Sequence, residues 1–203
     1  MNRLADDIAT TKPAPGAFAL FFLGQAGFVL KTAEGKVIYV DPYFSDACNR
    51  MFGFKRIIPP PIAADDVVVD LFITTHDHAD HLDPDSVPTI VKNNPHAVFA
   101  GPVECVEAFQ KLAPRTPPVL LKPNLEFTPF PGVKVAGVPC DHGELAPNAL
   151  GIILEIAGRR VYFLGDTCYR EDIFQAAAAR PADVLVPTIN GKFGNPDSTP
   201  AAR

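Results

Sequence analysis

Hydrophobic residues along the chain occur in short runs that predict strands separated by polar turns and a few helices. The first apolar stretch covers residues 17–40 and is interrupted at residues 33–36 by the polar sequence AEGK. A Glu-Gly step between β-branched and aromatic residues is typical of a hairpin. A second hairpin is expected where residues 151–156 turn into the apolar run 160–167. Other runs predict strands at residues 67–75, 97–101, 118–122, 133–140 and 183–189.

Three segments between these runs are predicted to be helices, which together with the strands indicates an α/β fold class. Asp83 is a suitable N-cap and Pro84 suits the first helical position, so a helix is expected through about Asn93. Residues 102–113 carry apolar positions on one helical face. Residues 171–179 predict the third helix.

Proline is frequent, with 22 among 203 residues, and it punctuates the loops between apolar segments. Residues 43–66 follow no hydrophobic period and include three consecutive prolines at 59–61. Consecutive prolines exclude both a helix interior and a central strand. We therefore expect a long ordered loop there, and such loops in compact domains are often functional.

Length and composition predict a single domain over residues 1–203, because 47% of the residues are hydrophobic and can bury a core. The net charge is −5 and no basic block stands out, which argues against nucleic acid as a partner. No apolar stretch reaches the roughly 18 residues of a membrane span, and the amino terminus lacks the apolar region of a signal peptide. A cytoplasmic protein with no membrane partner is therefore expected.

The carboxyl-terminal sequence NPDSTPAAR is typical of a helix start, with Ser198 or Thr199 as N-cap and Pro200 in the first turn. Only three residues follow that proline, and a single helical turn has little stability of its own. This pattern predicts a domain that lacks its carboxyl-terminal portion. The alternative is a frayed polar tail. An unfinished sheet edge would expose apolar surface, so a homo-oligomer is one option.

Ligand-type residues are concentrated in the sequence ITTHDHADHLDP at residues 73–84, which holds three of the five histidines of the chain. In an extended segment His76 and His78 point to the same side and can bind one ion, while a turn directs Asp80 and His81 toward a second ion. Imidazole and carboxylate suit zinc, manganese or iron, and the absence of cysteine from this loop argues against a closed structural zinc site.

Further ligand-type residues follow other predicted strands. Asp41, Asp141, His142 and Asp166 all lie at such ends, where α/β folds assemble their sites. Two neighbouring ions can share a hydroxide and a bridging carboxylate, and Asp166 is the natural bridge. Asp41 either supports His76 or His78 by a hydrogen bond or only shapes the turn before Pro42.

The motif H-x-H-x-D-H at residues 76–81, the later His142 and the sequence LGDT at residues 164–167 resemble the metallo-β-lactamase-fold hydrolases. The stretches PGAFALFFLGQAGFVLKT, KRIIPPP and NGKFGN are similar to the branch that contains the L-ascorbate-6-phosphate lactonases. The resemblance implies an αββα sandwich with two divalent ions at one edge. It assigns the first ion to His76, His78 and His142, the second to Asp80 and His81, and both to Asp166.

Two aspects of the metal site stay open. In such families the second ion usually also has a histidine from a later loop, and this chain has no histidine after His142. The gap agrees with a missing carboxyl-terminal portion and leaves the completeness of the second site in question. The lactonase branch points toward manganese and the superfamily at large toward zinc, while iron is also compatible with these ligands.

The resemblance implies a metal-dependent hydrolase in which a metal-bound hydroxide attacks a lactone, an ester or a small phosphorylated metabolite. Asp80 is placed to orient the hydroxide or to pass a proton to the leaving group. Arg56 and Lys192 either bind a phosphate on the substrate or are solvated loop charges. The alternatives are a phosphodiesterase and a truncated relative that binds metal without catalysis.

Overall fold

The computed structural model describes residues 3–192 and 195–196. It contains two compact units, residues 1–119 and residues 120–203. The single domain expected from the chain length stays a prediction. The helix start expected at Ser198, Thr199 and Pro200 lies outside the described residues.

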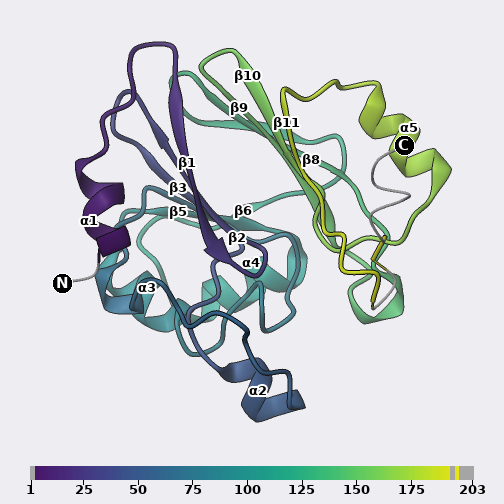
Figure 1. Ribbon diagram of the computed structural model, residues 1–203, viewed down its shortest axis with the longest axis horizontal. Helices are drawn as coiled ribbons and strands as arrows, with labels where there is room; N and C mark the ends of the chain where they lie inside the picture. Colours follow the sequence, from purple (N-terminus) through teal and green to yellow (C-terminus); the bar gives the residue numbers. More distant parts are fainter. Residues whose placement is uncertain (1–2, 193–194, 197–203) are drawn as a thin grey trace. The chain divides into compact units, whose positions relative to one another are not determined.

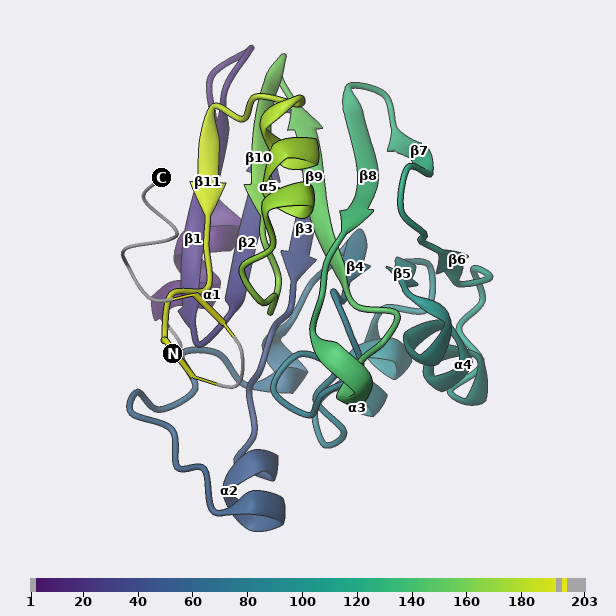
Figure 2. The ribbon, with the colours of Figure 1, turned by 90° about the vertical axis from the view of Figure 1, so that its right-hand side faces the viewer.

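The first sheet has six strands in sequence order, from β1 at one edge to β6 at the other (Figures 1 and 2). Antiparallel pairing joins β1 to β2 and β2 to β3, whereas β3, β4 and β5 run parallel. The predicted hairpin around AEGK is thus confirmed. The strands are β1 (Phe18–Gly24), β2 (Gly27–Thr32), β3 (Val37–Val40), β4 (Leu71–Ile73), β5 (Val98–Gly101) and β6 (Val119–Leu120).

The core of the first unit contains a group of three aromatic rings. Phe72, Phe99 and Phe109 are fully buried, with ring centroids 5.3 to 5.9 Å apart. Phe109 belongs to α4, so the ring contacts fix this helix against the sheet. The helices of the unit are α1 (Arg3–Thr10), α2 (Ala47–Phe52), η1 (Ala64–Asp66), α3 (Val87–Asn93) and α4 (Val103–Lys111).

Three predictions for this unit need correction. The helix expected from Pro84 begins at Val87, because the Asp83 carboxylate accepts hydrogen bonds in the turn before it, including one of 2.6 Å from the hydroxyl of Ser86. The strand expected at residues 67–75 pairs only at Leu71–Ile73. The long loop at residues 43–66 contains two short helices, α2 and η1, which the absence of a hydrophobic period did not indicate.

The second unit has a five-stranded sheet in the order β11-β10-β9-β8-β7. The predicted second hairpin is confirmed, and Ala157 and Gly158 at its turn both have positive φ, as a two-residue turn of this kind requires. Phe174 of α5 packs against a buried cluster that includes Tyr162, so α5 covers one face of the sheet (Figure 2). The elements are β7 (Glu126–Phe130), β8 (Val133–Pro139), η2 (Gly143–Leu145), β9 (Leu150–Ile156), β10 (Arg159–Phe163), α5 (Glu171–Ala178) and β11 (Val184–Val186).

The strand ends carry the ligand-type residues. In the first unit Asp41 directly follows β3, and the segment 76–81 follows β4. In the second unit His142 follows β8 and Asp166 follows β10. Within the part of the chain that the structure describes, no helix is long and apolar enough to cross a membrane.

Candidate metal centre

Asp41 is a buried carboxylate that ties the ends of β3 and β4 together. Its side chain is 3% exposed and its backbone φ is +46°, a conformation that Asp and Asn tolerate better than other residues with side chains. One carboxylate oxygen accepts a 2.7 Å hydrogen bond from the backbone N–H of Thr75. The other accepts a 2.7 Å bond from the Thr75 hydroxyl and lies 2.9 Å from Nδ1 of His81. The carboxylate therefore contacts His81 directly and reaches His76 only through Thr75.

These contacts decide which nitrogen of two buried histidines carries the proton. An ionised carboxylate only accepts hydrogen bonds, so Nδ1 of His81 must donate to Asp41. The single hydroxyl proton of Thr75 is used on Asp41, so its oxygen accepts from Nδ1 of His76, which lies 3.1 Å away. In both imidazoles Nε2 is then the nitrogen without a proton, which is the form that binds a metal ion.

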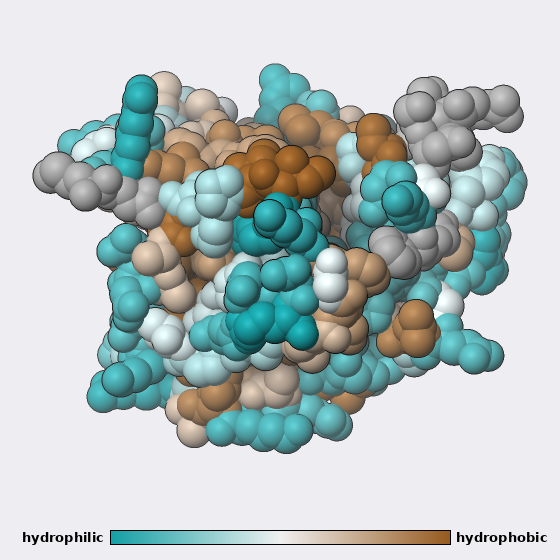
Figure 3. All heavy atoms as spheres, turned by 60° about the horizontal axis from the view of Figure 1, so that its bottom comes forward, coloured by the Kyte–Doolittle hydropathy of each residue, from teal (hydrophilic) through white to brown (hydrophobic). Residues whose placement is uncertain are grey.

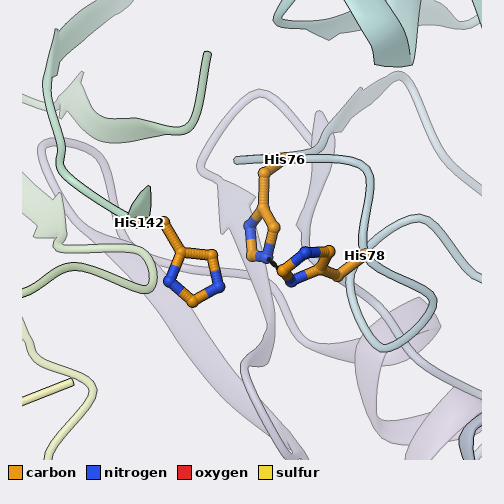
Figure 4. Close-up of side chains that lie close together, drawn as sticks. All are labelled: His76, His78 and His142. Carbon is orange, nitrogen blue, oxygen red and sulfur yellow. Dashed lines mark hydrogen bonds between the residues drawn. The ribbon is translucent and has the colours of Figure 1, made fainter. Parts of the chain in front are cut away.

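His76 and His78 converge in the way that ligands of one ion do (Figure 4). Nε2 of His76 lies 3.0 Å from Nδ1 of His78, and the ring centroids are 4.5 Å apart. Two imidazole nitrogens on one tetrahedral zinc ion lie about 3.3 Å apart, so this pair needs little adjustment to bind a cation. The ring of His81 also lies 4.0 Å from that of His76. The donor set of this loop therefore fits a divalent metal ion.

Asp80 is the more accessible member of the loop. Its side chain is 40% exposed, and its Oδ2 lies 3.9 Å from Nε2 of His81. A turn closed by the backbone hydrogen bond from His81 to the carbonyl of His78 redirects the chain here. The two side chains therefore lie near each other, and the Asp80 carboxylate is open enough to meet a substrate, while their role at a second ion stays a prediction.

The second unit holds His142 and Asp166 close together. Nε2 of His142 lies 3.9 Å from Oδ2 of Asp166, and both side chains are largely buried. The two loops are joined by a backbone hydrogen bond from Cys168 to Asp141 and by one from the Asp141 N–H to the hydroxyl of Thr167. The loops after β8 and β10 therefore form a single ligand-bearing edge of this unit.

Asp141 has a structural partner of its own. The guanidinium of Arg170 donates to its carboxylate at 3.1 Å, and the backbone N–H of Gly143 donates at 3.1 Å. The Arg170 guanidinium, followed by the Gly143 N–H, holds the pKa of the Asp141 carboxyl below its usual value. Because these donors engage Asp141, it shapes the turn that presents His142.

The two predicted substrate residues differ in their surroundings. The Arg56 guanidinium stacks on the ring of Tyr43 at 4.6 Å and donates to the carbonyl oxygens of Tyr43, Ser45 and Ile58. Burial lowers the pKa of Arg56. This arrangement fixes the loop after Asp41, whereas Lys192 is exposed in the second unit. The substrate role of both residues stays a prediction.

Asp83 is a second buried carboxylate whose role the sequence did not indicate. It is fully buried and accepts hydrogen bonds of 2.9 Å from the backbone N–H groups of Phe44 and Ser45, and of 2.7 Å from the Ser45 hydroxyl. It also accepts from the N–H of Asp85 and the hydroxyl of Ser86. Asp83 thereby holds the loop after Asp41 against the histidine loop. In the sequence, Asp83 is interpreted as a helix N-cap, because Asp is also a common residue at that position.

Comparison with known proteins identifies the family. Residues 36–194 match the family described as the β-lactamase superfamily domain. The chain belongs to this superfamily. A metal-dependent hydrolase of Polynucleobacter asymbioticus is 31% identical over 211 residues, covering 91% of this chain and 70% of that protein. Relatives named metal-dependent hydrolases support the prediction that this chain is a hydrolase.

Two further comparisons show how far the similarity in sequence and in fold extends. A Shigella boydii protein named "Probable L-ascorbate-6-phosphate lactonase" is 31% identical over 126 residues, covering 51% of this chain and 36% of that protein. The metallo-β-lactamase fold protein YhfI from Bacillus subtilis superposes with a TM-score of 0.64 at 19% identity, over 89% of this chain and 72% of that one. The family and fold class predicted from the sequence are therefore confirmed.

Replacing Asp41 by asparagine tests the hydrogen bonds that orient the histidines. Asparagine tolerates the positive φ, so the backbone should be unchanged. Its amide N–H₂ cannot accept from His81 or Thr75, and losing such a supporting partner lowers metal affinity about 10- to 100-fold. Competition with a chelator of known affinity measures the change. Asp70→Asn is the matched control, because its half-exposed carboxylate pairs with Lys36 away from the histidines. Equal affinities of Asp41→Asn and the unmodified chain would contradict the assignment.

Proposed function

We propose that this chain is a metal-dependent hydrolase that acts on a lactone, an ester or a small phosphorylated metabolite. The observation that carries the proposal is the hydrogen-bond geometry of the histidine loop. Nδ1 of His76 lies 3.1 Å from the Thr75 hydroxyl and Nδ1 of His81 lies 2.9 Å from the Asp41 carboxylate, so Nε2 is the nitrogen of each ring that is placed to bind a metal ion. Membership in the β-lactamase superfamily and relatives named metal-dependent hydrolases support the same reading.

The proposed ligand set follows the family motif residue by residue. His76, His78 and His142 bind one divalent ion, Asp80 and His81 bind a second, and Asp166 binds both. Zinc and manganese are the metals we propose, and iron has compatible ligand preferences. When bound, such ions lower the pKa of a water molecule and polarise the bond that is to be cleaved.

The residues of the chain then have distinct tasks. Asp41 and Thr75 keep the imidazole rings in the orientation and tautomer that bind a cation. The accessible carboxylate of Asp80 orients the attacking group and moves its proton toward the leaving group. For a lactone the leaving group stays attached to the product, so the ring-opened acid must leave the site as one molecule.

Metal analysis and turnover together test this proposal. The purified chain is analysed by plasma mass spectrometry and assayed with a series of lactones, carboxylic esters and phosphodiesters after addition of Zn²⁺ or Mn²⁺. We expect about two ions per chain and hydrolysis of lactones or esters. A preference for phosphodiesters would favour the phosphodiesterase alternative. One ion per chain without turnover would favour a metal-binding relative that lacks catalysis.

The variant Asp80→Asn tests the carboxylate to which the proposal gives both the second ion and the proton transfer. Removing a group that transfers protons lowers the rate by about 100-fold or more, whereas the ion held by His76 and His78 should remain bound. The ratio of kcat between variant and parent, at matched metal content, measures the effect. Asp77→Asn is the control, since Asp77 lies in the same loop and is exposed. Equal kcat values for Asp80→Asn and the parent would remove Asp80 from the mechanism.

A further inference from the structure

The segment Met51–Ile58, called here the apolar arm, exposes an unusual amount of apolar surface. Five large side chains within these eight residues are each more than half exposed. Ile57 reaches 95%. Contiguous exposed apolar surface of this kind marks an interaction site in a folded protein. The five are Met51, Phe52, Phe54, Ile57 and Ile58.

The apolar arm is held in place at both ends and in the middle. At its start, Cys48 of α2 is buried in a cluster that packs against Ala79 of the histidine loop. The backbone N–H of Phe54 donates to the carbonyl of Cys48, and Arg56 binds the carbonyl of Ile58. Just beyond the arm, Ile62 is 1% exposed. The arm therefore presents its apolar side chains from a fixed backbone.

The charge of this region differs from that of the chain as a whole. Residues 47–62 contain no acidic residue, although the net charge of the protein is −5. Arg50 pairs with Asp46 and Asp85 outside the arm. Within the described residues no ion pair of Lys55 is found, and Arg56 binds only backbone carbonyl groups. The arm is thus both apolar and basic.

The face in Figure 3 shows how apolar and polar residues share the surface on the side where α2 lies in Figure 1. Hydrophobic residues reach the surface there next to hydrophilic ones. An amphipathic surface with basic residues beside aromatic and aliphatic ones is what binds the boundary between headgroups and acyl chains of an anionic bilayer.

Other occupants fit the arm less well. A small-molecule site buries most of its ligand, and a side chain as open as Ile57 cannot form such an enclosure. A second copy of the chain would bring two identical arms together, and each carries Lys55 without an acidic residue in the arm to meet it. A bilayer of anionic lipid supplies negative charge for the basic side chain of the arm and an apolar layer for its exposed apolar side chains.

We propose that the apolar arm docks on the surface of a bilayer that contains anionic lipid. The aromatic and isoleucine side chains enter the headgroup boundary while Lys55 meets lipid phosphates. The expectation of no membrane partner rested on the absence of a spanning segment, whereas this proposal concerns the surface of a bilayer. It does not depend on the hydrolase activity.

Co-sedimentation with vesicles tests the proposal. The chain is mixed at low salt with vesicles of equal parts phosphatidylglycerol and phosphatidylcholine, or of phosphatidylcholine alone. We expect binding to the anionic vesicles and a weaker response to the neutral ones. The double variant Phe54→Ser, Ile57→Ser should reduce partitioning by about tenfold or more, because two large apolar side chains no longer leave water. Lys55→Glu should reduce binding only to the anionic vesicles, by about fivefold or more.

The matched control is Val68→Ser, which alters an apolar side chain that is 71% exposed outside the arm. It should bind vesicles like the parent, and circular dichroism should show that every variant is folded. Absence of binding to anionic vesicles would overturn the proposal, as would equal loss in Val68→Ser. Sedimentation velocity without lipid gives the remaining outcome. Self-association that the double variant abolishes would assign the arm to a second copy instead.

Discussion

We expect the double substitution His76→Ala, His78→Ala to remove the bound metal while both sheets stay folded. The two rings converge with nitrogens 3.0 Å apart, as two ligands of one ion do. Loss of a supporting partner alone weakens a metal site about 10- to 100-fold, so loss of two ligands must exceed about 100-fold. Plasma mass spectrometry after dialysis measures the metal, and far-ultraviolet circular dichroism monitors the sheets.

The control for this experiment is His96→Ala. His96 is exposed and lies between α3 and β5, away from the histidine loop in sequence. Its removal should leave the metal content unchanged. A double variant that kept its full metal content would show that His76 and His78 are not ligands. A double variant that lost its secondary structure would instead assign these rings to the core.

The second large effect concerns stability. We expect Asp83→Ala to lower the free energy of unfolding by about 3–5 kcal/mol, because buried donors lose their acceptor and each unsatisfied one costs about 1–3 kcal/mol. The donors include the backbone N–H groups of buried Phe44 and of partly buried Ser45. Asp83→Asn keeps one acceptor oxygen and should lose less. Urea unfolding followed by circular dichroism gives the three values.

Asp85→Ala is the matched control for Asp83. Asp85 lies two residues away and pairs with Arg50, but its side chain is 41% exposed. Exposed ion pairs contribute at most about 1 kcal/mol, so this variant should be nearly as stable as the parent. Similar losses of stability in Asp83→Ala and Asp85→Ala would show that the buried hydrogen bonds do not hold the loop.

Elements with strong local patterns were predictable from the sequence. Both hairpins, α4 and α5 were anticipated because each repeats its apolar positions over enough residues, or has a turn with a clear chemical preference. The helix α2 and the strand β7 were missed, since each is short, four of the six residues of α2 are exposed and no residue of β7 is fully buried. In such segments contacts elsewhere in the chain decide the structure.

Side-chain partners far apart in sequence were the least predictable part of the site. The residue types for metal binding were visible in one twelve-residue loop, yet the partner of Asp41 was not. Its carboxylate lies against His81 and Thr75, 40 and 34 positions away. The side chain of Asp83 binds a loop 39 residues earlier and is therefore not the N-cap of α3. The spacing of residues along the chain does not predict such long-range contacts.

The hydrogen bonds between Asp41 and Thr75 affect how fast the site takes up an ion. Because the rings of His76 and His81 are oriented by hydrogen bonds within the protein, an arriving ion does not have to order them. Little rotamer freedom is lost on binding, and little of the binding free energy is spent on ordering side chains. Association should then be limited by the release of water from the ion. The rate of metal exchange should then be set mostly by the dissociation rate of the bound ion.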